Sequence, residues 1–448
     1  MLRRYRDFLI DAADEVADTL VSETGKPRAD AYGGELFFVC DSIGYWSRNA
    51  ARILAPSSPR LHLLKSKKAY STYKPRGVVG VVAPWNFPLI LTVGEAVPAL
   101  MAGNAVVIKP SELTPLTTLL ACRIAVEAGL PADLLACVTG NGSVGAELVE
   151  HADMIAFTGS TETGRKIAVR AAELLKPVSL ELGGKDPMIV RRDADLDRAA
   201  AGCVWGALAN TGQVCMSVER VYVHQAVYER FVDKVVEQVG RVRQGEPAAD
   251  VDIGAVASQE QLDKIAAHVD DARQRGARVL AGGEAVAGEK GYWYPPTVVA
   301  DVPDASLLMR DETFGPVIAL AAVDSDDEAV DKANASRYGL SASVWSRDRR
   351  AATELGRAID TGAVCVNDHM VHMGIPEVPT GGVADSGLGR RHGDEGLRKF
   401  CDQQTVVVDR FGLKREPQWF PVPKHSADRM RRVLRVLFRS GLRNKLGG

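Results

Sequence analysis

Apolar positions follow a helical rhythm at the start of the chain. Across residues 2–54 they recur about 3.6 residues apart, as in Leu9, Ala13 and Val16, which predicts helices interrupted near Pro27. Short continuous apolar runs then alternate with amphipathic stretches, a pattern typical of buried parallel strands joined by helices. The predicted strands are 69–73, 78–83, 105–109, 134–139, 154–157 and 178–182, and the predicted helices are 115–129, 143–151 and 161–176.

A second rhythm of the same kind begins after Gly183-Gly184. Strands are predicted at 218–224, 278–281, 317–322 and 364–367, and helices at 196–210, 226–240, 258–275 and 326–335. Strands that alternate with helices build doubly wound parallel sheets. The pattern therefore predicts an α/β protein with two α/β halves.

Charge is distributed unevenly along the 448 residues. The net charge is −2, but residues 411–448 contain ten Lys and Arg and only two acids, so the tail carries +8 and the rest −10. A body this acidic is not expected to bind nucleic acid. The length suits two or three domains, and the composition excludes intrinsic disorder and collagen.

Targeting signals and a disulfide framework are not expected. The N-terminus has no apolar core of a signal peptide, and no apolar run reaches the roughly 18 residues of a membrane span. We therefore expect a soluble, cytoplasmic protein. The seven cysteines are odd in number and without CxxC spacing, which predicts reduced thiols and neither a zinc site nor a disulfide framework.

Three turns in the first half could hold a nucleotide. The run 140–145 matches G-x-G-x-x-G between a strand and a helix, although an ordinary turn explains it equally well. The run 157–165 places hydroxyls and backbone N–H groups where a helix starts; there a pyrophosphate fits, and so does simple helix capping. Lys109 and Glu112, at the end of another strand, could both reach ribose hydroxyls.

Three residues suggest covalent chemistry. Cys215 follows a glycine-containing break in a helical stretch, where an electropositive turn would lower its pKa, although most cysteines are inert. Glu181 ends a strand before two glycines and could act as a general base. Asn86 lies in the rigid turn Pro84–Pro88, where its amide could donate to an oxyanion or merely shape the turn.

With these residues assembled, the chain resembles the NAD(P)-dependent aldehyde dehydrogenase superfamily from its start to about residue 410. The motifs occur in family order: PWNFP at 84–88, KPSE at 109–112, FTGSTETG at 157–164, ELGGK at 181–185, GQVC at 212–215, ETFGP at 312–316 and GG…SGLGR at 381–390. The resemblance implies that Cys215 attacks the aldehyde, that Asn86 and the Cys215 N–H hold the oxyanion, and that Glu181 activates the water that hydrolyses the thioester.

The same resemblance assigns the cofactor site. Lys109 and Glu112 would hold the adenosine ribose, and Glu112 favours NAD over NADP because its charge repels a 2′-phosphate. The other implied contacts are the phosphate-binding residues Gly159, Ser160, Thr161 and Gly164, then Glu312 at the nicotinamide ribose, Phe314 near that ring, Gly142 bordering the adenine side, and Trp85 as a further cofactor-binding residue.

The resemblance also implies a domain plan. It gives an NAD-binding domain at 1–56 and 76–182, a catalytic domain at 183–390, and oligomerisation strands at 57–75 and 401–410 that would form a homodimer or homotetramer. Compared with the family the chain begins late, through a misassigned start or a naturally short N-terminus. The basic tail, 411–448, is not characteristic of the superfamily.

The substrate is less well specified. The sequence is most similar to bacterial succinate-semialdehyde dehydrogenases, yet Gly94 lies where those enzymes carry a carboxylate-binding Arg. Gly94 and the small residues of 379–382 predict a wide tunnel that Leu89 and Leu91 make apolar, and hence a bulky or apolar aldehyde. The alternatives are succinate semialdehyde, a CoA-acylating enzyme, against which Glu181 argues, and a non-catalytic relative, against which Cys215 and Asn86 argue.

Within the tail, Met430, Val433, Leu434, Leu437 and Phe438 recur at helical spacing among arginines. A basic amphipathic helix of this kind is typical of a segment that lies on a membrane surface, here over 424–446. The same pattern fits an apolar face that packs on a neighbouring subunit.

Overall fold

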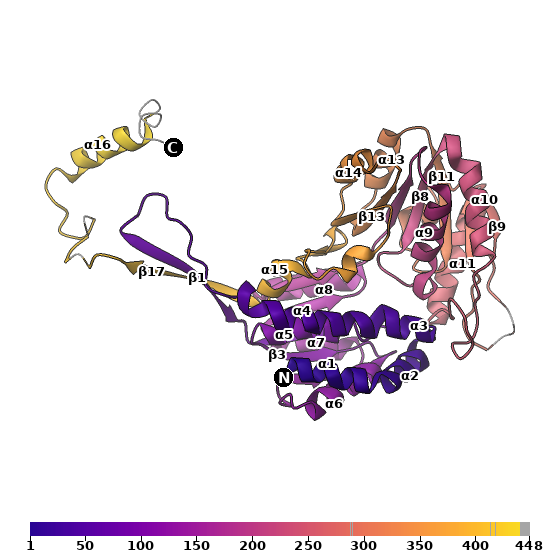
Figure 1. Ribbon diagram of the computed structural model, residues 1–448, viewed down its shortest axis with the longest axis horizontal. Helices are drawn as coiled ribbons and strands as arrows, with labels where there is room; N and C mark the ends of the chain where they lie inside the picture. Colours follow the sequence, from indigo (N-terminus) through magenta and orange to yellow (C-terminus); the bar gives the residue numbers. More distant parts are fainter. Residues whose placement is uncertain (287, 289, 413, 417, 440–448) are drawn as a thin grey trace. The chain divides into compact units, whose positions relative to one another are not determined.

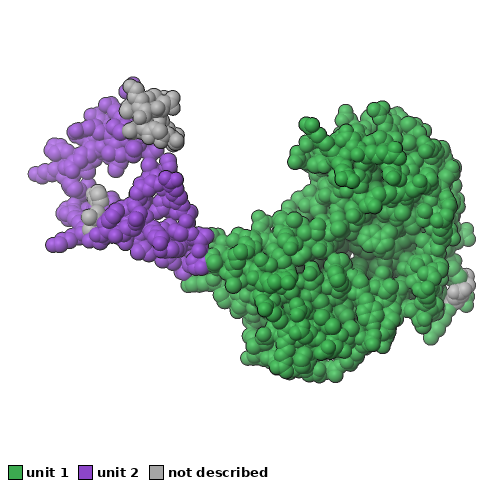
Figure 2. All heavy atoms as spheres, viewed as in Figure 1, with its two compact units in different colours: residues 1–55, 73–403 green, residues 56–72, 404–448 purple. Residues whose placement is uncertain are grey.

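The computed structural model describes residues 1–286, 288, 290–412, 414–416 and 418–439. The chain divides into two compact units (Figure 2). One comprises Met1–Ala55 and Tyr73–Gln403, and the other Pro56–Thr72 and Gln404–Gly448. Among the described residues, no helix is both long enough and apolar enough to cross a bilayer.

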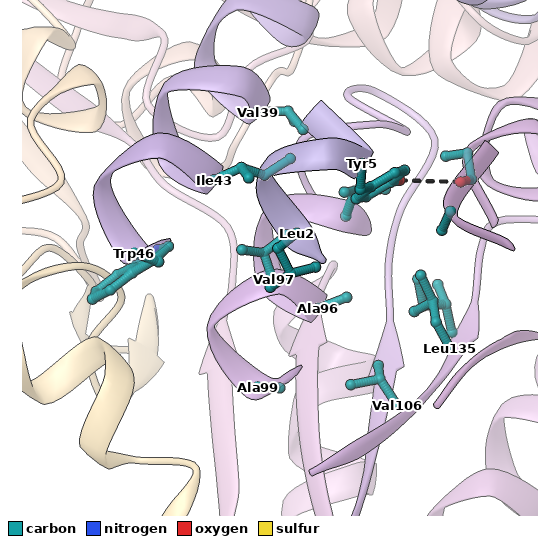
Figure 3. Packing of buried hydrophobic residues seen from close by; sticks show 14 of the residues in the cluster. Leu2, Tyr5, Val39, Ile43, Trp46, Ala96, Val97, Ala99, Val106 and Leu135 are labelled. Atoms are coloured by element: carbon teal, nitrogen blue, oxygen red, sulfur yellow. Dashed lines mark hydrogen bonds between the residues drawn. The ribbon is translucent and has the colours of Figure 1, made fainter. Parts of the chain in front are cut away.

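Helices open the larger unit. They are α1 (Leu2–Asp11), α2 (Ala13–Thr24), α3 (Arg28–Asp30), the π-helix η1 (Ala31–Leu36) and α4 (Phe37–Ile53). The predicted interruption is confirmed, because Gly25 ends α2 in the left-handed conformation, at φ 70°. In Figure 3, Leu2 and Tyr5 of α1 pack near Ile43 of α4, and the Tyr5 hydroxyl donates to the Ala121 carbonyl at 3.1 Å.

The first sheet has the strand order β16-β6-β5-β2-β3-β4. Its members are β2 (Val78–Val82), β3 (Ala105–Lys109), β4 (Leu135–Cys137), β5 (Met154–Thr158), β6 (Val178–Glu181) and the antiparallel edge strand β16 (Gly387–Leu388). Strand β2 pairs in parallel with both β3 and β5, so the strand order reverses there. In open α/β sheets ligands bind at such a point, beyond the carboxyl ends of the strands.

Helices cover both faces of this sheet. Val79, Val81 and Ile108 join the core formed with α1, α4, α5 (Val93–Met101) and α6 (Pro115–Glu127). Ile155 and Phe157 share a second core with α7 (Gly142–His151) and α8 (Thr161–Glu173). Side chains of successive residues in a strand point to opposite faces of the sheet, so neighbouring residues are buried in different cores.

The second sheet has the order β14-β13-β7-β8-β11-β10-β9 and is also covered on both faces (Figure 1). Met188 and Val190 face α9 and α10, whereas Ile189 faces α11, α13 and α14. The strands are β7 (Asp186–Val190), β8 (Val218–His224), β9 (Arg278–Ala281), β10 (Thr297–Ala300), β11 (Val317–Val323), β13 (Ser341–Trp345) and β14 (Ala363–Val366), and the helices are α9 (Leu196–Leu208), α10 (Tyr228–Val239), α11 (Gln259–Gln274), α12 (Leu307–Arg310), α13 (Asp326–Asn334) and α14 (Arg349–Arg357).

Short elements complete the fold. They are the 3₁₀ turns η2 (Ala209–Gly212), η3 (Gln225–Val227) and η4 (Val371–Gly374), the pair β12 (Tyr338–Gly339) and β15 (Val383–Ala384), and α15 (Gly393–Arg398). Strand β1 (Lys67–Pro75) pairs with β17 (Cys401–Asp409) in a separate two-stranded sheet, and α16 (Ser426–Phe438) follows. The larger unit thus contains both predicted α/β halves. The finer domain plan stays a prediction.

Candidate functional site

Four motifs that are far apart in the sequence meet at one edge of the first sheet. Asn86 follows β2, Lys109 ends β3, Ser160 follows β5 and Glu181 ends β6. These strands are parallel, so their carboxyl ends lie together, and the edge includes the point where the strand order reverses. The fold therefore brings candidate catalytic and cofactor residues to the place where this architecture binds ligands.

Cys215 lies in the loop between η2 and β8, which is held in an unusual conformation. Asn210, Thr211 and Gly212 have consecutive positive φ values of 50°, 60° and 73°. For the two residues with a Cβ this backbone costs energy, and such strain persists only where the surroundings enforce it. Gly212 is required because an added Cβ would lie 2.1 Å from the Gly315 carbonyl oxygen.

Gly184 brings the ELGGK segment against Cys215. A Cβ added at Gly184 would lie 2.1 Å from the Cys215 carbonyl oxygen, so only glycine permits this approach. The Gly184 N–H donates to Glu312 Oε1 at 2.9 Å. These two contacts bring the Cys215 loop, the ELGGK segment and Glu312 together.

The surroundings of Cys215 are apolar and acidic. Cys215 packs against a small apolar cluster, as do Phe87, Met370 and Met373; the buried members of this cluster are Val214, Met216 and Leu340. Burial, followed by the charges of Glu312 and Glu181, raises the pKa of the Cys215 thiol to about 12. This corrects the expectation of an electropositive turn that lowers the pKa, because the nearby carboxylates outweigh the charge of Arg391.

Asn86 is aimed at the loop that carries the nucleophile. Its Nδ2 donates to the carbonyl oxygen of Gln213 at 3.0 Å, two residues before Cys215, and the side chain is buried. One of the two amide N–H groups remains for an oxyanion. The main-chain carbonyl oxygen of Asn86 in turn accepts hydrogen bonds from Lys26 Nζ at 2.9 Å and from Asn210 Nδ2 at 3.1 Å.

A buried ion pair that sequence reasoning missed holds this turn. Lys26 Nζ lies 2.6 Å from Glu35 Oε1, and both side chains are fully buried. Glu35 Oε2 accepts from the backbone N–H groups of Leu89 and Ile90 at 2.7 and 3.2 Å. A lysine beside a helix break and an acid on the next helix look solvated in the sequence, so no local signal reveals the pair.

Glu181 has the setting of a general base. Its Oε1 is buried and has no hydrogen-bond partner among the described residues, and a Cβ added at Gly381 would lie 2.9 Å from it. Burial raises the pKa of the Glu181 carboxyl to about 7, although the charges of Arg391 and Lys399 oppose that rise. A base with a pKa near neutrality is suited to proton transfer. The small size of Gly381 therefore makes room for Glu181.

A second buried charge cluster lies beside Glu181. Arg391 Nε donates to Glu95 Oε2 at 2.9 Å, its Nη2 donates to Thr158 Oγ1 at 3.3 Å, and Lys399 also binds Glu95. Thr158 is the residue paired with Glu181 across β5 and β6. No local signal in the sequence reveals this cluster, because Glu95 lies in α5, Arg391 directly follows the SGLGR motif and Lys399 follows α15.

Another missed pair fixes the ETFGP segment. Lys185 Nζ binds the Glu219 carboxylate, which accepts from the Thr313 N–H at 2.8 Å and from the Phe314 N–H at 2.8 Å. The Phe314 ring meets the Trp85 ring edge to face, with centroids 5.6 Å apart. Two predicted cofactor residues from different sheets are thereby in contact.

The remaining candidate cofactor residues occupy helix starts and strand ends. Ser160 is the N-cap of α8, where its Oγ accepts from the Thr163 N–H at 3.3 Å, and Thr161 Oγ1 donates to the Asp385 carbonyl at 3.0 Å. The capping interpretation of Ser160 is thus confirmed, and the exposed start of α8 also suits a phosphate. Gly164 is buried, because a Cβ there would lie 2.4 Å from Leu182 Cδ2, so it serves helix packing.

Lys109 and Glu112 form a pair beside the α7 start. Lys109 Nζ lies 3.3 Å from Glu112 Oε2, with the lysine buried and the glutamate side chain 56% exposed. A hydrogen bond from its own backbone N–H, then the charge of Lys109, lowers the pKa of Glu112. Gly142 begins α7, next to the N-cap Asn141. An exposed carboxylate that accepts hydrogen bonds, a buried ammonium and the N–H groups of a helix start together fit a dinucleotide.

The pocket beside Gly94 is narrower than expected. It has a volume of about 20 Å³, room for about one water. Leu89 and Leu91 are buried in the protein, and Ile90 lines the pocket with Gly94, one helical turn away. Leu89 and Leu91 do not line this pocket, so the wide apolar tunnel stays a prediction. The other lining residues are Phe38, Asp41, Ser42, Met373, Gly374, Pro376, Arg391 and His392.

The model of the aldehyde dehydrogenase family matches residues 1–406. The chain belongs to the aldehyde dehydrogenase family. A relative from Mycolicibacterium smegmatis named "Putative succinate-semialdehyde dehydrogenase (NADP+)" is 41% identical, over 92% of this chain and 80% of that protein. A "4,4'-diapolycopene aldehyde oxidase" from a Methylomonas species is 40% identical over 92% of this chain and 78% of its own length.

A solved structure agrees with this aldehyde dehydrogenase assignment. The NAD-dependent aldehyde dehydrogenase from Sinorhizobium meliloti superposes with a TM-score of 0.89 at 37% identity, covering 94% of this chain and 82% of that one. The fold is therefore the aldehyde dehydrogenase fold, with two main parallel sheets and a small antiparallel sheet. The protein is an oxidoreductase that oxidises aldehydes with NAD or NADP.

Proposed function

We propose that this aldehyde dehydrogenase uses Cys215 as its nucleophile, Asn86 and the Cys215 N–H as its oxyanion hole, and Glu181 as its base. The observation that carries the proposal is the close approach of Gly184 to the Cys215 carbonyl, which joins the Glu181 strand to the nucleophile loop. The burial of Asn86 and its hydrogen bond to the Gln213 carbonyl support its role in the oxyanion hole.

The thiol first adds to the aldehyde. Its sulfur bonds to the carbonyl carbon while Glu181, with a pKa near 7, takes the thiol proton. The negative charge that develops on the oxygen is stabilised by the Asn86 amide and the Cys215 N–H, which are positioned before the reaction. Bound at the cofactor residues proposed below, a nicotinamide would supply the acceptor for the hydride on the same carbon, which would leave a thioester on Cys215.

Hydrolysis then releases the acid. Glu181 first releases the thiol proton to solvent and then removes a proton from water, whose oxygen bonds to the thioester carbon. The carbon–sulfur bond breaks, and the sulfur leaves as thiolate. Glu181 favours this route over transfer to CoA. An assay of NADH or NADPH formation with and without CoA tests it, and a requirement for CoA would contradict hydrolysis.

We propose an apolar aldehyde as substrate. Phe87, Met370 and Met373 pack in the same apolar cluster as Cys215, and Met373 also lines the small pocket beside Gly94, which holds about one water and not the aldehyde chain. Arg391, a cation in that lining, is already bound to Glu95, while Asp41 would repel a carboxylate. The Methylomonas relative is named for a long hydrocarbon aldehyde, which agrees with this choice.

Succinate semialdehyde is the second candidate, because the mycobacterial relative carries that name. Steady-state rates with decanal, benzaldehyde and succinic semialdehyde decide between the two. We expect the highest kcat/KM for decanal, and a clear preference for succinic semialdehyde would refute the apolar assignment. A Cys215→Ala variant, expected to be inactive with every aldehyde, controls for background reduction of the cofactor.

The cofactor residues support NAD. Glu112 presents an exposed, ionised carboxylate beside Lys109, where a ribose hydroxyl could bind and a 2′-phosphate would be repelled. For the remaining contacts we propose Ser160, Thr161 and Gly159 at the phosphates, Glu312 at the nicotinamide ribose, Trp85 and Phe314 near the ring, and Gly142 at the adenine side. Higher kcat/KM with NADP, as the name of the mycobacterial relative suggests, would contradict this preference.

The paired strands β1 and β17 support assembly into a homo-oligomer. A two-stranded sheet is only marginally stable alone. Val406, Val407 and Val408 are exposed on β17. We propose that a second copy covers this sheet, and sedimentation velocity of a Val407→Lys variant beside the wild type tests it.

A further inference from the structure

The helix α16 has an apolar face that no part of the described chain covers. No residue of α16 is buried. Met430, Val433, Leu434, Leu437 and Phe438 are between 39% and 58% exposed. At about 100° per residue these five side chains fall within an arc of about 140°. The predicted amphipathic helix is thus confirmed over 426–438, while 440–446 lie outside the described residues.

Cations border this arc and fill the opposite side. In helical projection Arg429 and Arg431 lie at its two borders, and Arg432 and Arg435 lie opposite. Acids nearby are already engaged: Asp428 lies 3.8 Å from Arg431, and Glu416 binds Lys67. The segment 411–439 contains eight Lys and Arg against two acids, so its charge is +6.

Exposed aromatic side chains precede the helix. Phe411, Trp419 and Phe420 are 65%, 53% and 89% exposed. Aromatic residues of this kind favour the boundary between lipid headgroups and acyl chains. They extend the apolar surface of the tail beyond α16.

We propose that the tail binds the surface of an anionic lipid bilayer, with α16 lying in the interface. The apolar arc would enter the acyl boundary while Arg429 and Arg431 reach the headgroup phosphates on either side. A helix of 13 residues is about 20 Å long, too short to cross the roughly 30 Å core, so it lies on the membrane. A second copy of this acidic protein would also attract the tail, but it would need carboxylates along both borders of the apolar arc.

The test uses the full chain and vesicles of phosphatidylcholine with or without 30% phosphatidylglycerol, in about 150 mM salt. We expect the wild type to co-sediment with the anionic vesicles at least about tenfold more strongly than with neutral ones. A Val433→Gln/Leu437→Gln variant keeps the charge and should lose binding about tenfold or more. Arg429→Gln/Arg431→Gln should lose the preference for anionic vesicles.

The matched control is Val169→Gln/Leu175→Gln, which makes the same two exchanges at exposed sites of the larger unit. It should bind like the wild type. Failure of the wild type to bind anionic vesicles would overturn the proposal, as would equal binding by Val433→Gln/Leu437→Gln. If that variant instead changes the oligomeric state and no form binds vesicles, the face belongs to a second copy and the proposal is refuted.

This inference does not depend on the proposed substrate, because sedimentation needs no turnover. One further readout does rest on the proposed function. Long-chain aldehyde dissolved in anionic vesicles should be oxidised faster by the wild type than by Val433→Gln/Leu437→Gln, while both oxidise benzaldehyde in free solution equally. Membrane binding without that difference in rate would leave the lipid interface standing and refute delivery of an apolar substrate.

Discussion

The Arg391 guanidinium donates to the Glu95 carboxylate at 2.9 Å, and both side chains are buried beside Glu181. Burial alone would raise the pKa of Glu95, but Lys399 and Arg391 lower it to about 2, so it stays ionised. The charges of this cluster both raise and lower the pKa of Glu181. Arg391 and Lys399 lower the pKa of the Glu181 carboxyl and Glu95 raises it.

Substitutions in this cluster should move the pH dependence of turnover in opposite directions. Glu181 is protonated, and inactive as a base, below its pKa of about 7, so kcat should fall as the pH drops through 7. Arg391→Met removes a cation and should shift the acidic limb of the kcat–pH profile to higher pH. Glu95→Gln removes a carboxylate and should shift that limb to lower pH. Arg391→Lys should restore the position. A purely structural role for the cluster would change kcat without moving the limb.

Glu312 should control the reactivity of Cys215. Its charge is the largest single charge that raises the pKa of the thiol. Glu312→Gln should therefore lower that pKa and speed alkylation by iodoacetamide at pH 8 several-fold. Turnover should fall in the same variant if Glu312 also holds the cofactor ribose. Alkylation at the wild-type rate would show that Glu312 does not act on the thiol.

Glu35 should support both stability and turnover. Glu35→Gln leaves Lys26 buried without its counter-charge, which typically costs about 3–5 kcal/mol in the free energy of unfolding. It also loosens the turn that carries Asn86, so kcat should fall by about tenfold or more, short of the 10²–10³ lost with an oxyanion donor. Urea unfolding and steady-state kinetics measure the two effects.

Glu23 provides the matched control for Glu35. It also accepts two backbone N–H groups, from Leu116 and Thr117 at 2.6 and 2.8 Å, but at the start of α6 and partly exposed to solvent. Glu23→Gln should cost less stability and leave kcat unchanged. An equal loss of kcat in both variants would indicate general destabilisation rather than misplacement of Asn86.

The approach of Gly184 to Cys215 predicts a sharp difference between two glycines. Gly184→Ala would place a methyl group 2.1 Å from the Cys215 carbonyl oxygen, so the nucleophile loop must shift. We expect loss of turnover by about 100-fold, since small misplacements of reacting groups are costly. Gly33→Ala, where nothing lies within 4 Å of the added carbon, should be active. Full activity of Gly184→Ala would contradict the geometry.

Glu112 should set the choice of cofactor. Glu112→Ser removes the charge opposed to a 2′-phosphate, and kcat/KM for NADP should rise about tenfold relative to NAD. Glu127→Ser, an exposed acid at the end of α6, serves as control and should leave the ratio unchanged. An unchanged ratio in Glu112→Ser would place the cofactor selectivity elsewhere.

Most elements could be predicted from hydrophobic pattern, but several buried strands could not. Strand β7 begins with Asp186 and Pro187, which are typical of turns, and β13 alternates Ser with small apolar residues, so neither shows a strand signal. Helix α5 contains Pro98 and is buried on nearly every side. Tertiary packing, not local propensity, determines these elements.

Some residues of the candidate site could likewise be predicted from the sequence, and others could not. Cys215, Glu181 and Asn86 could be named from motifs, and the strand ends explain why they converge. The residues that hold these three in place could not be predicted. Glu35, Glu95 and Glu219 are buried, and their cation partners lie 9, 304 and 34 residues away in the sequence. A single sequence does not show which distant cation neutralises a given acid.

The edge strand β16 has a consequence for how the enzyme forms. Gly387 pairs with Glu181, so the strand carrying the candidate base is closed by residues that follow the whole second sheet. During synthesis the ribosome must release nearly 390 residues before this edge can pair, and such long-range contacts form late in folding. A nascent chain therefore carries the candidate nucleophile well before the candidate site is complete. An N-terminal fragment ending before β16 would contain Cys215, Asn86 and Glu181 without the strand that borders the candidate base.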